Sequence, residues 1–139
     1  MVFDSGSQSD AHALERLRTD MIGWLTTVTP DGQPQTLPIW FLWEDGEVLI
    51  YGDRRAKRNV NIATNPRVAM HLGDDGKGND IVFLEGEARV DAAAPPLPEN
   101  AAYLAKYGEW IARELESPEE MATIYNVPLR IRPTRARAF

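Results

Sequence analysis

The chain has 139 residues, of which 43% are hydrophobic and 26% charged, a composition that excludes a disordered or fibrous protein. The absence of cysteine excludes a disulfide framework, a thiolate metal site and a cysteine nucleophile, and the net charge of −6 argues against a nucleic-acid partner. No apolar run approaches the roughly 18 residues of a membrane span, and no signal peptide is recognisable, so we expect a cytoplasmic protein.

Turn signals divide most of the chain into short extended segments. The polar segment 1–10 is expected to be flexible, and a short helix is predicted over residues 12–18. Strands are predicted where β-branched and aromatic residues lie between Pro-, Asp- and Gly-containing turns: residues 24–29, 33–43, 47–51, 67–72 and 81–90, with a last strand over 129–137.

Helical spacing replaces the extended pattern in three places. In residues 54–65 apolar side chains recur on one face, Asp53 is the predicted N-cap, and Asn65-Pro66 should end the helix. A Pro-rich segment, 94–98, precedes a longer helix. The sequence Ser117-Pro118-Glu119-Glu120 then combines the cap, proline and acids that are typical of a further helix start.

The order of these elements predicts a mainly β protein with helices (α+β). We expect a six-stranded antiparallel barrel, because closure removes the unpaired edges that an open sheet exposes. Pro34 and Pro38 require that the second strand lie at an edge or contain a bulge. The sequence shows no internal repeat, so residues 1–139 are predicted to form one domain.

Nucleophilic and zinc catalysis are disfavoured by the residues that such chemistry needs. Three of the four serines fall in the first ten residues, which leaves Ser117 at a helix start as the remaining candidate nucleophile. The two histidines, His12 and His71, lack the spacing of a zinc site. No metal site is therefore predicted.

Four of the fifteen basic residues form one cluster: Arg54, Arg55, Lys57 and Arg58. They lie at the predicted start of a helix, where free backbone N–H groups and the positive end of the helix dipole attract anions. Cations are unfavourable there for the helix itself, so a bound phosphate or a neighbouring acid such as Asp53 should compensate. Spacing alone leaves both alternatives open, a phosphate site or a solvated basic face.

Two further groups of residues also allow two interpretations. The aromatic run at residues 39–43 is suited either to line a pocket for a flat ring or to pack in the core and at an interface. Arginines recur at alternate positions of the last strand, with a change of parity near Pro133-Thr134, and they are either solvated or contact a second anion: Arg130, Arg132, Arg135 and Arg137. A phosphate site without a nucleophile, metal or acid–base pair indicates a cofactor that carries its own chemistry.

Several short stretches occur in an order and spacing that are more specific than any one of them: Gln33–Phe41, Tyr51-Gly52, Lys57-Arg58-Asn59, Asn65–Val68, Leu84–Ala88, Tyr103–Tyr107, Tyr125–Pro128 and Arg130–Arg135. Together they resemble the pyridoxamine 5'-phosphate oxidase-like split β-barrel superfamily, in particular the actinobacterial branch that uses the deazaflavin coenzyme F-420. The likeness extends from about Met21 to the end of the chain.

The resemblance implies an FMN-binding split-barrel type of fold and a homodimer with two cofactor sites at the subunit interface. The cofactor phosphate would be held by basic residues, with an asparagine in support: Arg55, Lys57, Arg58 and Asn59. The deazaflavin ring would lie against the segment Leu37, Pro38, Ile39 and Trp40, and the site would also include Tyr51 and Gly52. Gly52 departs from the family pattern, because a serine is expected there and its side-chain contact to phosphate would be missing.

The implied reaction is hydride transfer between the deazaflavin and an unsaturated small-molecule substrate, with orientation and a dry pocket supplied by the protein. No catalytic residue is assigned; Tyr51 and His71 qualify as proton donors by type alone. One alternative keeps the fold and replaces the cofactor by FMN, in an oxidase or reductase. Another is a carrier protein that binds a cofactor without turnover.

Overall fold

The computed structural model describes residues 2–4 and 6–139; Met1 and Ser5, part of the segment predicted to be flexible, lie outside the described residues. Four α-helices and a 3-10 turn accompany the strands: α1 (Gln8–Thr19), α2 (Lys57–Thr64), η1 (Leu97–Glu99), α3 (Ala101–Glu114) and α4 (Pro118–Ala122). The strands are β1 (Gly23–Val28), β2 (Pro34–Ile39), β3 (Leu42–Glu44), β4 (Glu47–Asp53), β5 (Arg67–Leu72), β6 (Val82–Val90) and β7 (Tyr125–Ala138).

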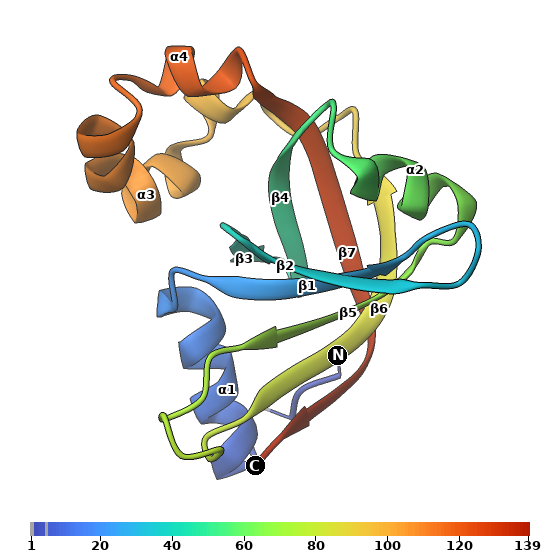
Figure 1. Cartoon of the computed structure of the whole chain (residues 1–139). Helices are drawn as coiled ribbons and strands as arrows, with labels where there is room; N and C mark the ends of the chain where they lie inside the picture. The colour runs from blue at the N-terminus through green and yellow to red at the C-terminus, as the bar shows by residue number, and fades with distance from the viewer. Residues whose placement is uncertain (1, 5) are drawn as a thin grey trace.

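All seven strands form one antiparallel sheet in the order β2-β1-β5-β6-β7-β4-β3. Strands β2 and β3 follow each other in the chain, separated by Trp40 and Phe41, yet they occupy opposite edges of the sheet. The sheet must therefore curl until its two edges approach each other, and it forms a half-barrel (Figure 1). The mixed α+β architecture confirms the predicted class.

The predicted number of six strands is wrong, because the segment 33–43 forms two strands instead of one. The break falls at Phe41, whose backbone N–H donates to the Tyr107 hydroxyl at 2.8 Å and whose carbonyl accepts from Lys106 Nζ at 2.8 Å. Side chains of α3 thus replace a neighbouring strand at this residue. Strand β2, which carries Pro34 and Pro38, lies at an edge as predicted.

Strands β6 and β7 are the longest pair and contain a bulge. Glu85 pairs with Arg135 and Gly86 with Pro133, which leaves Thr134 without a partner and produces the predicted change of alternation in the last strand. A Cβ on Gly86 would lie 2.6 Å from the Arg132 carbonyl oxygen, so this close crossing requires glycine.

Two hydrophobic cores lie on the two faces of β4. Val48 and Ile50 point into the half-barrel, where they pack in a core shared with α1 and α2. Leu49 and Tyr51 point to the other side and pack in a second core against α3 and α4. This explains why the strand is almost continuously apolar rather than alternating. Figure 1 shows α3 and α4 set to one side of the sheet and α2 to the other.

Two helices begin at other residues than predicted. Helix α1 begins at Gln8, four residues before the predicted start. Helix α2 begins at Lys57 with Ala56 as N-cap, so the prediction of Asp53 as the cap is wrong. The Asp53 carboxylate instead accepts hydrogen bonds from the backbone and side chain of Arg55, which keeps this segment in a turn. None of the described helices combines the length and low charge needed to cross a lipid bilayer.

Candidate functional site

Two pockets meet at the start of α2. Pocket A has a volume of about 420 Å³ and is mostly apolar, with its wall formed by β2, β4, α2, α3 and the segment around α4: Ile22, Pro38, Ile39, Trp40, Ile50, Tyr51, Arg58, Tyr103, Glu114, Leu115, Met121 and Tyr125. Pocket B, of about 320 Å³, lies between β1, β2 and α2: Leu25, Thr27, Gln35, Thr36, Leu37, Ala56, Lys57 and Arg58. Arg58 is the residue that the two pockets share.

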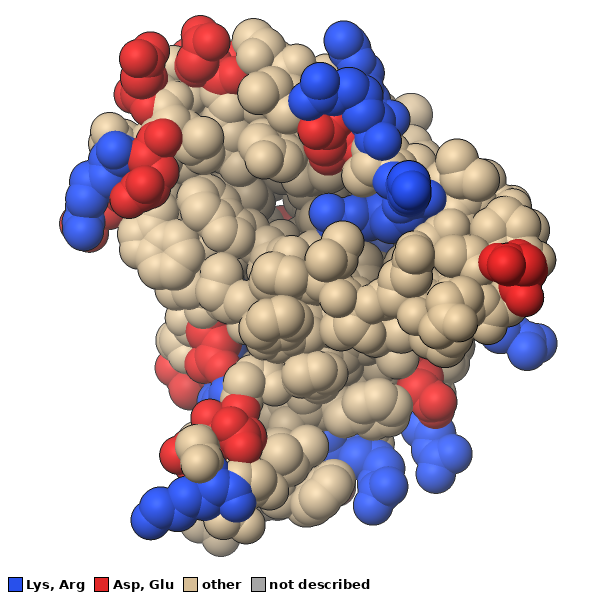
Figure 2. Space-filling view, viewed as in Figure 1, with Lys and Arg blue, Asp and Glu red and all other residues tan. Residues whose placement is uncertain are grey.

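The wall of pocket A is stiffened by stacked aromatic rings. Trp40 stacks on Tyr107 with ring centroids 4.8 Å apart and an interplanar angle of 4°, and Trp110 packs edge-on against it. Tyr103 is fully buried between Tyr51 and Tyr107. Figure 2 shows a hollow between the α3–α4 segment and the rest of the molecule, with Lys and Arg gathered on its α2 side. The pocket therefore offers a firm apolar wall opposite a basic rim.

Arg58 is a partly buried cation that forms no ion pair with an acid of the described residues. Its Nη1 atom is buried and forms no hydrogen bond with any described residue. Burial lowers the pKa of its guanidinium, and the more distant Tyr125 and Asp53 offset this only in part. A buried charged group without a partner is costly and rare in native proteins, so the position is chemically suited to an anion.

The neighbouring backbone and side chains favour an anion at the same place. Helix α2 has no side-chain hydrogen bond at its N-cap and no acid in its first turn, which leaves its first N–H groups available. Lys57 is exposed at the rim of pocket B. The Asn59 side-chain amide donates from Nδ2 to the Asp53 carbonyl, and its Oδ1 is buried with no hydrogen-bond partner among the described residues.

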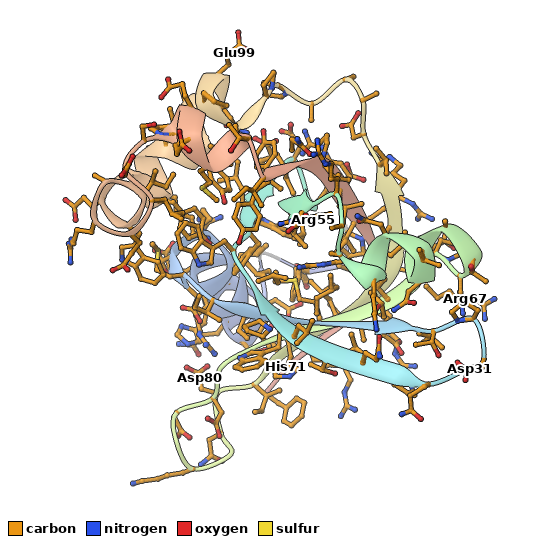
Figure 3. The ribbon with its side chains drawn as sticks, turned by 45° about the horizontal axis from the view of Figure 1, so that its top comes forward. Asp31, Arg55, Arg67, His71, Asp80 and Glu99 are labelled. Carbon is orange, nitrogen blue, oxygen red and sulfur yellow. The ribbon has the colours of Figure 1, made fainter. Side chains whose placement is uncertain are left out.

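Arg55 has a different environment from Arg58. Its guanidinium forms a two-point ion pair with Asp53, with N–O distances of 3.1 and 3.2 Å, and the side chain is 74% exposed. The hydrogen bonds from Arg55 lower the pKa of the Asp53 carboxyl. In Figure 3 Arg55 lies above the space between α2 and the α3–α4 segment. Its charge is already matched by an acid, as the solvated interpretation of the basic cluster expected.

Tyr51 contributes its ring to pocket A, while its hydroxyl is engaged elsewhere. The hydroxyl donates to the Pro95 carbonyl and accepts from Asn100 Nδ2 at 3.0 Å, which ties β4 to the N-terminus of α3. Burial raises its pKa. Gly52, the next residue, has room for a side chain, because an added Cβ would meet its nearest atoms at 3.8 Å.

The structure brings most of the predicted binding residues to the two pockets. Pocket A receives five of them: Pro38, Ile39, Trp40, Tyr51 and Arg58. Pocket B receives Leu37 and Lys57 beside the shared Arg58. Gly52, Arg55 and Asn59 line neither pocket.

The far wall of pocket A was not predicted from the sequence. It is formed by Leu115, Met121 and Tyr125, with Glu114 as the second charged group of the pocket. Tyr125 opens a stretch that carried the family resemblance, and this was the signal that could have found it. Pocket B likewise contains Thr27, whose hydroxyl accepts from the buried Asn61 Nδ2 at 3.0 Å.

His71 does not share a pocket with Arg58. It lines a third cavity of about 590 Å³, pocket C, together with Trp24, Phe83, Arg137 and other residues. Its ring stacks on Trp24, and its Nδ1 lies 2.9 Å from the Leu72 carbonyl oxygen. In Figure 3 His71 and Arg55 lie on opposite sides of the β1–β2 hairpin.

The C-terminal arginines have separate environments. Arg130 is held by Glu44 at 2.7 Å and Asp91 at 2.9 Å, and Arg132 pairs with Glu87 at 3.1 Å. Arg137 lies over the ring of Phe139, 4.9 Å from its centroid. Neither pocket A nor pocket B includes any of them.

Residues 9–138 match the family model described as pyridoxamine 5'-phosphate oxidase, and the chain belongs to this family. A search of curated proteins finds no match. A solved F-420 reductase is 27% identical to this chain with a TM-score of 0.66, over 88% of this chain and 94% of the reductase.

Two more distant structures show the fold alone. A conserved hypothetical protein from Mycobacterium tuberculosis has 23% identity and a TM-score of 0.75, over 96% of this chain and 85% of that one. An FAD-binding protein from Mesorhizobium loti has 16% identity and a TM-score of 0.65, over 91% of this chain and 90% of that one.

Proposed function

We propose that this member of the pyridoxamine 5'-phosphate oxidase family is an oxidoreductase that binds the deazaflavin coenzyme F-420 and transfers a hydride between it and an unsaturated small molecule. The observation that carries the proposal is Arg58, a partly buried cation that has no acidic partner among the described residues and lies where the two pockets meet. The 27% identity to an F-420 reductase supports the choice of cofactor.

The two pockets fit the two ends of such a cofactor. Arg58 and Lys57, with the free N–H groups of α2, are suited to hold a phosphate by charge-assisted hydrogen bonds. Pro38, Ile39 and the stacked Trp40 present a flat apolar surface to a ring in pocket A.

When bound, the reduced deazaflavin supplies a hydride to an electron-poor double bond. The chain's own residues orient the reactants and exclude water: Trp40, Leu115 and Met121 enclose the apolar part of pocket A. Two further tyrosines, Tyr103 and Tyr125, line pocket A. Burial raises the pKa of Tyr103, so its hydroxyl stays protonated and is suited to donate a hydrogen bond rather than to transfer a proton. We propose these two tyrosines as hydrogen-bond donors to the bound molecules and assign no proton donor.

Equilibrium titration of the purified protein with the deazaflavin and with FMN, side by side, tests the cofactor. We expect the deazaflavin to bind more tightly. FMN binding tighter by tenfold, about 1.4 kcal/mol, would overturn the choice in favour of an FMN-dependent oxidase or reductase. Turnover with the reduced cofactor and a panel of unsaturated acceptors separates an enzyme from a carrier, because a carrier would bind without oxidising the cofactor.

We also propose a homodimer, as the family resemblance implies. Strands β1 and β2 carry no charged residue, and β2 exposes five of its six residues at the sheet edge. Figure 2 shows a broad surface without Lys, Arg, Asp or Glu over this hairpin. Such surfaces are typical of interfaces. Light scattering should give a molar mass of twice 15.6 kDa for the wild type and a lower mass for Trp24→Glu. A monomeric wild type at micromolar concentration would contradict the proposal.

A further inference from the structure

Phe41 is held by two side chains of α3 at the point where the β-sheet is interrupted. Its N–H donates to the Tyr107 hydroxyl at 2.8 Å, and its carbonyl accepts from Lys106 Nζ at 2.8 Å. The Tyr107 hydroxyl also lies 2.8 Å from the Met21 carbonyl oxygen and 3.0 Å from that of Phe41, and it donates to one of them at a time. The backbone of residue 41 is therefore anchored from both sides.

The same two residues contact the aromatic rings on either side of this anchor. Lys106 Nζ lies 3.9 Å from the centroid of the Phe41 ring, a cation–π contact. The Tyr107 ring stacks on that of Trp40 at 4.8 Å, nearly parallel. Phe41 is fully buried, whereas Trp40 lines pocket A. Side chains of α3 thus contact both the main chain of Phe41 and the Trp40 ring that lines pocket A.

Lys106 is an unusual choice for a purely structural contact. It is partly buried, and none of the described carboxylates lies within ion-pair distance of its amine. Burial lowers its pKa to about 8, and the attraction of the more distant Asp20 offsets this only in part. An apolar side chain of similar length would fill the same space without the cost of a buried charge. The amine gains in return its hydrogen bond to the Phe41 carbonyl and its contact with the Phe41 ring.

We infer that Lys106 and Tyr107 are positioning residues, which clamp Phe41 and thereby set the orientation of Trp40 in the wall of pocket A. They do not line the pocket themselves. The expected effect on cofactor binding rests on the proposed function. The orientation of Trp40 does not, because it is a property of the protein without ligand.

The test compares three variants with the wild type. Lys106→Met removes the positive charge and the hydrogen-bond donor while keeping the length of the side chain. Lys106→Arg keeps both the charge and a donor. Tyr107→Phe removes only the hydroxyl, and it keeps the test decisive if Lys106→Met does not fold. Lys77→Met, in the exposed loop before β6, is the matched control.

Near-ultraviolet circular dichroism reports the stacking of Trp40 on Tyr107, with Trp40→Phe identifying that contribution. We expect Lys106→Met and Tyr107→Phe to lose this signal while urea denaturation still shows a folded protein. Lys106→Arg and Lys77→Met should retain it. An unchanged signal in both Lys106→Met and Tyr107→Phe would overturn the inference.

The second measurement is the dissociation constant of the deazaflavin. Loss of one anchoring hydrogen bond should weaken binding by about tenfold in Lys106→Met, with recovery in Lys106→Arg. Unchanged affinity despite an altered dichroism signal would show that Trp40 orientation does not matter for binding, and would overturn the assigned role. If the wild type binds neither deazaflavin nor FMN, the proposed function fails, while the dichroism result still decides the clamp.

Discussion

Arg58 and Arg130 are both partly buried, but their surroundings differ. Arg130 lies between two carboxylates, Glu44 and Asp91, and joins β7 to β3 and to the end of β6. Burial alone would lower its pKa, but the hydrogen bonds to Asp91 and Glu44 outweigh this and raise it. At Arg58 burial dominates, and the pKa is lowered. A partly buried cation with acidic partners stabilises the fold, whereas one that has none among the described residues is free to bind an anion, as we propose for Arg58.

The largest effect on stability is expected at Arg130. Arg130→Met should lower the free energy of unfolding by about 2–3 kcal/mol, because two carboxylates that are more than two-thirds buried lose their partner. Cofactor affinity should not change. Urea denaturation measures the free energy of unfolding, and titration with the deazaflavin measures the affinity. Arg132→Met is the control, because the Arg132–Glu87 pair is exposed and its loss should hardly change stability.

The reverse result is expected at Arg58. Arg58→Met should weaken deazaflavin binding by about ten- to a hundredfold, the contribution of a charged hydrogen bond. The free energy of unfolding without ligand should stay constant or rise, because a buried charge without a partner is removed. Arg55→Met is the matched control, since Arg55 is exposed and paired with Asp53. Loss of stability together with unchanged binding would make Arg58 a structural residue like Arg130.

Lys57 should show a smaller effect in the same direction. Lys57→Ala removes one exposed ammonium at the rim of pocket B, and we expect binding to weaken by about tenfold. Lys77→Ala, in the loop before β6, should leave binding unchanged. If Lys77→Ala weakens binding and Lys57→Ala does not, the phosphate lies at the other end of the half-barrel.

Lys106 extends the comparison to a third partly buried cation, one whose charge can be titrated. Its pKa is about 8 in the folded protein against the ordinary value of 10.5 that the unfolded chain keeps. Between these values the unfolded chain binds more protons, so this group makes the free energy of unfolding rise as the pH increases from about 8 to 10.5. Tyr107, which faces the amine, stays neutral over this range because burial raises its pKa.

Denaturation of wild type and Lys106→Met at pH 7 and pH 9.5 measures this contribution. The wild type should gain stability relative to the variant at the higher pH. A constant difference between the two proteins would show that the amine keeps its ordinary pKa and is not held as the structure describes.

The smallest effect is expected at Gly52, where the basic site lacks the serine of the family pattern. An added Cβ meets nothing closer than 3.8 Å, so Gly52→Ser should fold normally. If the hydroxyl reaches the phosphate, deazaflavin binding should tighten by about three- to tenfold, as for one neutral hydrogen bond. Unchanged binding would place the phosphate away from this strand.

Local patterns predicted the parts of the fold that depend on neighbouring residues. The end of α2 at Asn65-Pro66, the cap of α4 at Ser117 and the edge position of β2 were all expected from the sequence. The basic cluster also indicated an anion site, but it did not distinguish Arg55, which Asp53 neutralises, from Arg58, which has no such partner.

The missed features depend on residues far apart in the chain. The break between β2 and β3 requires Tyr107, which lies 66 residues beyond Phe41. The far wall of pocket A consists of residues after position 113, whose approach to β2 follows from the curl of the whole sheet. Periodicity and turn residues carry no information on such contacts.

The position of β7 has a consequence for how the protein is made. This strand is the last of the seven to leave the ribosome, yet it lies between β6 and β4 in the sheet. Until it is inserted, the other strands form two separate groups, β2-β1-β5-β6 and β4-β3, whose inner edges are both unpaired. The nascent chain therefore cannot complete its sheet strand by strand, and newly made molecules expose two edges to aggregation until synthesis has passed Ala138.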